Sequence, residues 1–419
     1  MKTRKSLLAC LSTLALLALS SAASAQAVRP EQVGLSSERL ARIGELVDRH
    51  VEAGDITGAV TLVARNGRIG HLEAHGIMDI ASDRAMTEDA IFRIASMSKP
   101  VGAVAILMLI EEGKVRLEDP VSRFIPSYED MQVAVAQPRR GGFGPPPAPG
   151  TPPEFYTVPA ERDVTILDLL THTSGVMSGQ IGNSVGREAS QRRHDEGVAW
   201  TEAIGGAPLE FEPGTRWAYS ALAGFDVLSR VVEVVSGQTF NDFLRQRVFG
   251  PLGMSDTSFW PTAQQRQRLV TTYTERNNEL VPRENPDSMS GERYFSAAGG
   301  VVTTASDYAQ FAMMLANGGE LNGARILSRR SVELMGSVFI PDTLPGRRPG
   351  EGYGLGVRVV TDPALRGTWL SKGSFGWSGV YGTHFWVDPQ ENLIGIILAQ
   401  TAVRPMLNDF ETMVMQALE

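Results

Sequence analysis

The chain has 419 residues, of which 42% are hydrophobic and 21% charged, a composition typical of a soluble globular enzyme of roughly two domains. Its formal charge of −8 argues against a nucleic-acid-binding protein. The single cysteine, Cys10, lies near the amino terminus, so no cysteine nucleophile, disulfide or cysteine-ligated zinc site is expected in the rest of the chain.

Residues 1–25 have the three parts of a secretory signal peptide. The basic start, the apolar core and the small-residue cleavage site are Lys2-Thr3-Arg4-Lys5, residues 7–19 and Ala23-Ser24-Ala25. The apolar core is too short for a membrane span, and too little precedes Cys10 for a lipoprotein anchor. We predict a periplasmic or secreted protein with no membrane span once the signal is removed.

After the signal, periodicity predicts elements in chain order. Apolar positions between Leu40 and Val47 indicate an amphipathic helix. Residues 59–64 and 69–74 are strand-like and flank Asn66-Gly67, a strong hairpin signal. Residues 100–110 are apolar on every side, which predicts a helix buried in the core. The later segments are a Pro/Gly-rich exposed loop over 138–153, helices over 225–235 and 240–248, and adjacent strands over 379–387 and 393–398.

These elements predict a mixed α/β (α+β) protein. An antiparallel sheet flanked by helices is expected from residues 26–110 and 291–419, the two ends of the mature chain. Residues 111–290 are expected to form a mainly helical domain that carries the loop over 138–153. The active site would then lie in the cleft between these two parts.

The strongest chemical signal is Ser96-Met97-Ser98-Lys99, directly before the buried helix. A serine and a lysine three residues apart lie on the same face of a helix, one turn apart. A serine hydroxyl needs an adjacent base to become a nucleophile, and a lysine buried beneath a helix can lose its proton and supply one. The Ser-x-x-Lys pattern is found in the penicillin-recognising serine hydrolases.

Four further blocks follow in the order of that superfamily: residues 169–175, Pro213-Gly214 through Tyr219-Ser220, Pro251-Leu252-Gly253-Met254, and residues 298–304. With them the chain resembles the serine β-lactamase and penicillin-binding-protein-like superfamily, in its class C-like branch, and most closely the family VIII carboxylesterases. The resemblance implies a β-lactamase/transpeptidase-like fold. It also implies that Ser96 is acylated, that Lys99 and Tyr219 carry its proton, and that the N–H groups of Ser96 and Val380 form the oxyanion hole.

The third motif of the superfamily aligns with Trp377-Ser378-Gly379, which we expect to bind substrate. The superfamily usually has a lysine or histidine where this chain has Trp377, and an asparagine where it has Ala221. Ala221 has no side-chain amide for the substrate or Lys99. Trp377 offers an apolar wall and no cation to attract a carboxylate. Lys372-Gly373-Ser374 lies close by, but its glycine and hydroxyl residue are in the wrong order for this motif.

We therefore predict a serine carboxylesterase for small neutral esters, with no metal or organic cofactor. A β-lactamase or D,D-peptidase, an acyltransferase, and a non-catalytic binding or sensor module are the alternatives. The resemblance implies a structural role for His172, and His71 and His75 lack the further ligands of a metal site. The absence of a Gly-x-Ser-x-Gly elbow argues against an α/β-hydrolase.

Overall fold

The computed structural model describes residues 27–137 and 151–419. The signal peptide predicted over residues 1–25 lies outside these ranges, as do residues 138–150 of the predicted Pro/Gly-rich loop. Within the two ranges no helix combines the length and the apolar character that crossing a membrane requires.

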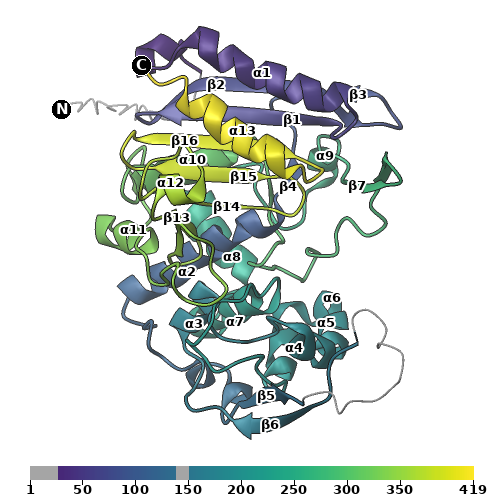
Figure 1. Cartoon of the computed structure of the whole chain (residues 1–419), viewed down its shortest axis with the longest axis vertical. Helices are drawn as coiled ribbons and strands as arrows, with labels where there is room; N and C mark the ends of the chain where they lie inside the picture. Colours follow the sequence, from purple (N-terminus) through teal and green to yellow (C-terminus); the bar gives the residue numbers. More distant parts are fainter. Residues whose placement is uncertain (1–26, 138–150) are drawn as a thin grey trace, which may run out of the picture.

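An eight-stranded antiparallel sheet forms the upper layer in Figure 1, and its strands come from both ends of the described chain. The strand order is β12-β13-β14-β15-β16-β1-β2-β3. In chain order the strands are β1 (Gly58–Arg65), β2 (Arg68–Asp79), β3 (Arg84–Ala85), β12 (Glu351–Tyr353), β13 (Arg358–Val360), β14 (Phe375–Ser378), β15 (His384–Asp388) and β16 (Leu393–Ala399).

The hairpin predicted around Asn66-Gly67 is confirmed, and it joins β1 to β2. Asn66 has φ 54° and Gly67 has φ 71°, the two positive values that a type I′ turn requires. Asparagine and glycine tolerate these angles better than other residues, and this is why the sequence signal is specific.

Helices cover both faces of the sheet, and the alternation of side chains along β1 separates the two cores. Ala59 and Val63 pack with α1 (Ser37–Glu52) and α13 (Arg404–Met415). Val60 and Leu62 belong to the larger core on the opposite face, which α10 (Ala305–Ala316) covers. Both faces of β1 are therefore buried. Figure 1 shows the helices of one face, α1 in purple at the top and α13 in yellow across the strands.

The buried helix predicted over residues 100–110 is confirmed as α2 (Ser98–Glu111). All its residues from Ser98 to Leu109 are buried. Pro100 lies in the first turn of the helix, where its missing N–H breaks no intrahelical hydrogen bond. Because α2 belongs to the core shared by the sheet and the lower helices, residues at its amino-terminal end are held from both sides.

The lower layer is mainly helical (Figure 1), and the helices predicted over 225–235 and 240–248 are present in it. The second of them ends as an α-helix at Leu244 and continues as one π-helical turn, Arg245–Phe249. The two predicted helices are α7 (Ala223–Ser236) and α8 (Phe240–Leu244). The remaining α-helices described are α3 (Ile166–Thr171), α4 (Gln180–Val185), α5 (Arg187–Gln191), α6 (Arg193–Glu196), α9 (Ala263–Arg266), α11 (Arg329–Met335) and α12 (Pro363–Arg366).

Short antiparallel strand pairs lie outside the main sheet, and none of them was predicted. The Pro/Gly-rich segment connects the two strands of one such pair, β5 and β6. The pairs are β5 (Gln132–Ala136) with β6 (Phe155–Pro159), β7 (Tyr273–Arg276) with β8 (Glu279–Pro282), β4 (Phe92–Arg93) with β9 (Val302–Thr303), and β10 (Glu320–Leu321) with β11 (Ala324–Arg325).

The strand predicted over residues 379–387 is confirmed from His384 onward, as part of β15, and is wrong for residues 379–383. Residues 379–383 form a turn between β14 and β15, and Gly382 in this turn has φ 86°. Aromatic and β-branched residues lie on both sides of this short turn, so the pattern resembled one continuous strand. Trp377-Ser378-Gly379 therefore ends a strand instead of opening one. The strand predicted over 393–398 is confirmed as β16, next to β15.

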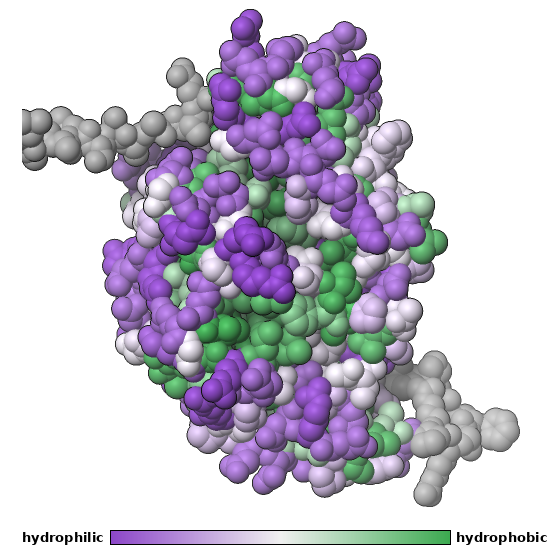
Figure 2. All heavy atoms as spheres, turned by 90° about the vertical axis from the view of Figure 1, so that its left-hand side faces the viewer, coloured by the Kyte–Doolittle hydropathy of each residue, from purple (hydrophilic) through white to green (hydrophobic). Residues whose placement is uncertain are grey.

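A second face of the molecule is shown in Figure 2. Hydrophobic residues gather there in a hollow across the middle, between hydrophilic residues above and below. The view is turned about the vertical axis, so the hollow lies at the height at which the sheet layer meets the helical layer in Figure 1.

A glycine within the sheet provides a test of this packing. Gly395 on β16 lies opposite Trp386 of β15, and a Cβ at residue 395 would lie 2.2 Å from the Trp386 ring. Trp386 is buried and packs against Phe410 of α13, so it has little room to move. We expect Gly395→Ala to lower the free energy of unfolding by about 1–3 kcal/mol, measured by chemical denaturation.

Gly206→Ala is the matched control, because a Cβ at residue 206 meets nothing within 4 Å. Its free energy of unfolding should stay within about 0.5 kcal/mol of the parent value. Equal stability of the two variants would contradict the described packing of Trp386 over β16.

Candidate active site

Ser96 lies in a strained turn directly before α2. The turn is a short 3₁₀ helix, Ala95–Met97, and Ala95 has φ 47°, an unfavourable value for a residue other than glycine. The Ser98 hydroxyl donates to the Ala95 carbonyl at 2.7 Å and accepts the Val301 N–H at 3.0 Å. The turn is thus clamped from two sides. Ser96 is the one residue of 91–100 that is only half-buried.

Lys99 is fully buried and directs its ammonium group toward three oxygen atoms. Its Nζ lies 3.3 Å from Ser96 Oγ, 2.8 Å from the Ala221 carbonyl and 2.7 Å from the Ala298 carbonyl. An ammonium has three N–H donors, so each finds one acceptor. The structure therefore brings Ser96 and Lys99 together at the one-turn spacing that the sequence predicted.

The expectation for Ala221 needs one correction. Its side chain offers no amide to Lys99, but its backbone carbonyl accepts one of the lysine N–H groups. A backbone contact of this kind does not depend on the residue type. For that reason, the replacement of the usual asparagine does not separate this segment from Lys99.

Tyr219 completes a triangle with Ser96 and Lys99. Its hydroxyl oxygen lies 2.7 Å from Ser96 Oγ, and the Lys99 Nζ lies 4.9 Å from the centre of its ring. Burial alone would raise the pKa of the Tyr219 phenol, but the Lys99 ammonium and the hydrogen bond with Ser96 outweigh burial and lower it. The phenolate form, which can accept the Ser96 proton, is therefore populated at a lower pH than in an ordinary tyrosine.

The end of α3 positions the Tyr219 segment. His172 caps this helix with φ 58°, and its carbonyl accepts the Ala218 N–H at 3.1 Å. The Thr173 carbonyl accepts the Gly214 N–H at 2.9 Å. Gly214 has φ 82°, so a glycine suits this turn. The block over residues 169–175 thus holds the chain on the approach to Tyr219.

The His172 ring lies against the site and makes no hydrogen bond to another described residue. It packs edge-on against Tyr219, with ring centres 4.7 Å apart. Burial, together with the nearby positive charges of Lys99 and Arg347, holds the pKa of His172 well below its ordinary value. His172 is therefore neutral. Together with Trp217, Tyr219, Tyr353 and Trp377 it forms a cluster of rings that we call the aromatic wall.

Trp377, at the end of β14, lies on the same wall. Its ring centre is 5.6 Å from that of Tyr219 and 5.4 Å from that of Tyr353. The Arg347 guanidinium stacks 4.4 Å above the ring of Trp217, which neighbours Tyr219 in turn. The aromatic wall therefore has one cation in contact with it, the Arg347 guanidinium on Trp217.

The turn after Trp377 packs directly on the Ser96 segment. The Thr383 hydroxyl donates to the Ile94 carbonyl at 3.0 Å, and a Cβ at Gly379 would lie 2.2 Å from that same oxygen. Val380 belongs to this turn. Among the described residues, neither the Ser96 N–H nor the Val380 N–H donates a hydrogen bond, so both are available to a substrate oxygen.

Lys372 lies in the turn that precedes β14, and its side chain is exposed. It is therefore at the opposite end of the strand from Trp377 and the Gly379 turn. This placement favours the alignment of the third motif with Trp377. His71 and His75 lie on β2, where they bond Thr61 at 2.8 Å and Asp48 at 2.9 Å.

Asp226 on α7 is a buried carboxylate behind Lys99 that sequence analysis missed. It accepts hydrogen bonds at 2.5 Å from the hydroxyls of Tyr294 and Ser296. Burial raises its pKa, and these hydrogen bonds and the Lys99 charge oppose the rise. The segment that Asp226 fixes leads to the Ala298 carbonyl. No local sequence pattern indicates this role, because Tyr294 and Ser296 lie 68 and 70 residues after Asp226 in the chain.

Comparisons with known proteins agree with this geometry. Residues 43–417 match the family model described as Beta-lactamase. Protein Rv1367c of Mycobacterium tuberculosis is 34% identical over 363 residues, which cover 83% of this chain and 87% of the relative. Esterase EstB of Burkholderia gladioli is 30% identical over 408 residues, which cover 91% and 96%.

A solved structure extends the likeness to the fold. EstCE1, described as a hydrolase with promiscuous acyltransferase activity, superposes with a TM-score of 0.75 at 26% identity and covers 91% of this chain and 98% of its own. The predicted α/β fold of the β-lactamase/transpeptidase type is therefore confirmed. The chain belongs to the β-lactamase family of serine hydrolases, as the motifs around Ser96 and Tyr219 indicated.

Proposed function

We propose that this protein is a serine carboxylesterase that cleaves small neutral esters through an acyl-enzyme on Ser96. One observation carries the proposal: Ser96 Oγ is within hydrogen-bond distance of both Tyr219 Oη and Lys99 Nζ. A nucleophile with two proton partners is what acyl transfer requires. Export, predicted from residues 1–25, is part of the same proposal.

The acylation step follows from these distances. Ser96 Oγ attacks the ester carbonyl carbon, and its proton passes to the Tyr219 oxygen at 2.7 Å. The Lys99 ammonium favours the phenolate form of Tyr219, so more of this base is available near neutral pH. The N–H groups of Ser96 and Val380 receive the carbonyl oxygen as it becomes negative. The carbon–oxygen bond to the alcohol then breaks, and the alcohol takes the proton from Tyr219.

Deacylation reverses this route. Water gives its proton to Tyr219 and attacks the Ser96 ester, and Ser96 then recovers the proton as the acid leaves. An alcohol in place of the water would yield a new ester. The likeness to EstCE1, which has promiscuous acyltransferase activity, favours this transfer as a second candidate function.

The aromatic wall favours the binding of neutral substrates over that of anionic ones. Trp377 lies where a lysine or histidine would attract a carboxylate, and it brings no formal charge. Arg347 is near the wall, but its Nη2 donates to the Gly352 carbonyl at 2.9 Å and lies 3.9 Å from the Glu351 carboxylate. Its charge is therefore already engaged within the protein.

The first test is a paired assay of the purified mature protein with p-nitrophenyl butyrate and a chromogenic cephalosporin, the nucleophile variant Ser96→Ala serving as control. We expect ester turnover that Ser96→Ala abolishes and little cephalosporin turnover. Methyl butyrate formed after addition of methanol would measure acyl transfer. Dominant cephalosporin turnover would contradict the esterase proposal and would favour the β-lactamase alternative, with Arg347 as the anchoring cation.

The second test concerns Tyr219. Because its pKa is lowered and the ionised phenol is the base, kcat/KM of the parent enzyme should rise with pH and level off below the ordinary phenol value of about 10. Tyr219→Phe should lower kcat/KM by roughly 10²–10⁴-fold and should abolish this rise.

Tyr156→Phe is the matched control, since Tyr156 is 51% exposed on β6. It should keep the parental rate and pH profile. A Tyr219→Phe variant with the parental pH profile would show that another group accepts the proton of Ser96.

A further inference from the structure

A cavity of about 490 Å³ lies between the edge of the main sheet and α13. Residues of β12, β13, α12 and α13 line it, and no member of the catalytic triangle does so. Its volume is in the range of small-molecule binding sites. We call it the arginine cavity, after three residues of its lining, Arg348, Arg358 and Arg366.

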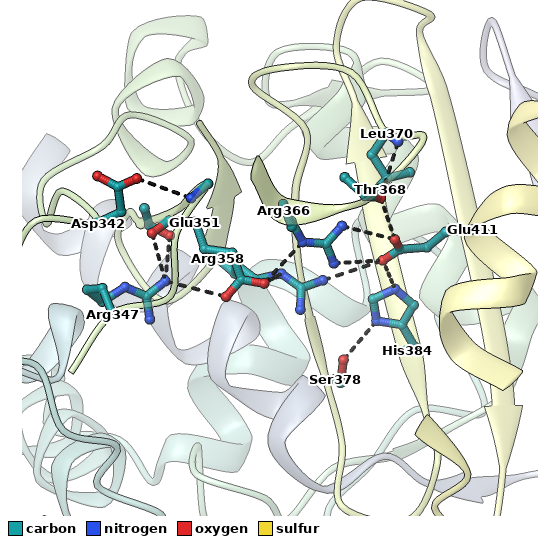
Figure 3. A network of polar contacts seen from close by, with 12 residues as sticks. Asp342, Arg347, Glu351, Arg358, Arg366, Thr368, Leu370, Ser378, His384 and Glu411 are labelled. Carbon is teal, nitrogen blue, oxygen red and sulfur yellow. Dashed lines mark hydrogen bonds and ion pairs between the residues drawn. The ribbon is translucent and has the colours of Figure 1, made fainter. Parts of the chain in front are cut away.

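The polar network in Figure 3 runs from the third motif to the lining of the arginine cavity. Ser378 Oγ on β14 lies 2.8 Å from Nδ1 of the buried His384 on β15. The other ring nitrogen of His384, Nε2, lies 3.1 Å from Oε1 of Glu411 on α13. Ser378 therefore directs its hydroxyl toward α13, and Glu411 connects this network to the cavity.

The Glu411 carboxylate has no capacity left for another donor. Arg366 donates to its two oxygens at 3.0 and 3.2 Å, and the Thr368 hydroxyl donates at 2.8 Å. Burial by itself would raise the pKa of Glu411, but the hydrogen bond with His384 and the nearby guanidiniums hold it well below its usual range. The ionised carboxylate only accepts, so His384 Nε2 carries a proton and supplies the fourth hydrogen bond.

Arg358 lies in the same network but is left without a hydrogen bond. Its guanidinium is 3.5 Å from the Glu411 carboxylate and 3.7 Å from that of Glu351, between which Figure 3 shows it. Glu351 Oε1 already accepts the Arg366 Nε–H at 3.0 Å. Burial lowers the pKa of Arg358, and the Arg366 charge adds to this effect. The two carboxylates therefore compensate the Arg358 charge only in part.

The donors of Arg358 open onto the arginine cavity. A guanidinium has five N–H groups, and those of Arg358 donate to no other described residue. The side chain is only 19% exposed, yet its three nitrogens all keep some access to solvent. Because Arg358 lines the cavity, this access leads into it. A largely buried cation with open donors favours an anion from outside the chain.

The rest of the lining indicates what kind of anion fits. Arg348 is exposed, and its positive charge acts on Arg358. Trp369 and Leu365 are 67% and 65% exposed, which provides apolar surface beside the cations. Asp409 also lines the cavity, and together with the two glutamates it repels a doubly charged ligand. The lining thus suits a single negative charge attached to an apolar body.

We propose that the arginine cavity binds a small organic monocarboxylate with an aromatic or apolar body. The carboxylate pairs with the Arg358 guanidinium, whose planar fork matches two oxygens, and Arg348 adds a second positive charge. The body of the ligand packs against Trp369 and Leu365. The site is separate from Ser96, so the inference goes beyond the proposed esterase function and does not depend on it.

Calorimetric titration of the purified mature protein with 3-phenylpropanoate tests the proposal, and 3-phenylpropanamide is the neutral analogue. We expect one carboxylate bound per protein and roughly tenfold or weaker binding of the amide, because the charge-assisted hydrogen bonds are lost. Equal affinities for the two compounds, or no binding of the carboxylate, would refute the proposal. 2-Phenylethyl phosphate, a dianion above its second pKa of about 6, should bind more weakly. Tighter binding of the phosphate would overturn the assignment of a monocarboxylate.

Substitutions then locate the bound carboxylate. Arg358→Gln should weaken the binding of 3-phenylpropanoate by roughly tenfold or more, and Trp369→Ala should weaken it severalfold. Arg245→Gln is the matched control, because Arg245 is 69% exposed and does not line the cavity. It should keep the parental affinity. A carboxylate bound at the catalytic site would be insensitive to both cavity variants, and that result would refute the proposal.

Arg348→Gln provides a second test that leaves the buried network intact, since Arg348 is exposed. It should weaken the binding of 3-phenylpropanoate severalfold. Thermal melting followed by circular dichroism shows whether each variant is folded. If Arg358→Gln does not fold, Arg348→Gln and Trp369→Ala decide the question, and parental affinity in both would refute the proposal.

Discussion

The burial of Lys99 is the constraint on which the site depends. Removing an ammonium from water is costly unless each of its donors finds an acceptor. Its acceptors come from three separate stretches: the turn before α2, the segment before α7 and the block before β9. All three must be in place together, so the sheet layer and the helical layer have to dock correctly before the lysine is satisfied. Because Ser96 and Tyr219 belong to the same triangle, the nucleophile is assembled by the same docking.

The charged groups on the two sides of the third motif, Trp377-Ser378-Gly379, are stabilised in different ways. On the Trp377 side, Lys99 is held by backbone carbonyls and lies beside the Tyr219 ring, and the Asp226 carboxyl group lies behind it. On the Ser378 side, guanidiniums and carboxylates pair with each other. Paired charges produce a weak net field, and their value here is directional, since they determine which ring nitrogen of His384 carries the proton.

Sequence patterns predicted the parts of the fold whose signal is local. The composition of α2 and the Asn66-Gly67 turn each identify one conformation, and the spacing from Ser96 to Lys99 matches one helical turn. The boundary between β14 and β15 was missed because a tight turn between aromatic-rich strands leaves little trace in an alternation pattern. The contribution of the Ala221 carbonyl was missed because a backbone acceptor has no side-chain signature. Asp226, His384 and Glu411 were missed because their partners are remote in the chain.

The pairing of β1 with β16 joins Ala59 to Ala399, close to the two ends of the described chain. During synthesis the β1–β2 hairpin emerges first, and its neighbour in the sheet, β16, begins 328 residues after the end of β1 (393 − 65). Until then β1 exposes an apolar edge that can pair with another chain, and contacts this distant in sequence form slowly. The central strands of the sheet therefore pair only after β16 has been made, and the interval before that is the period in which β1 is most open to aggregation.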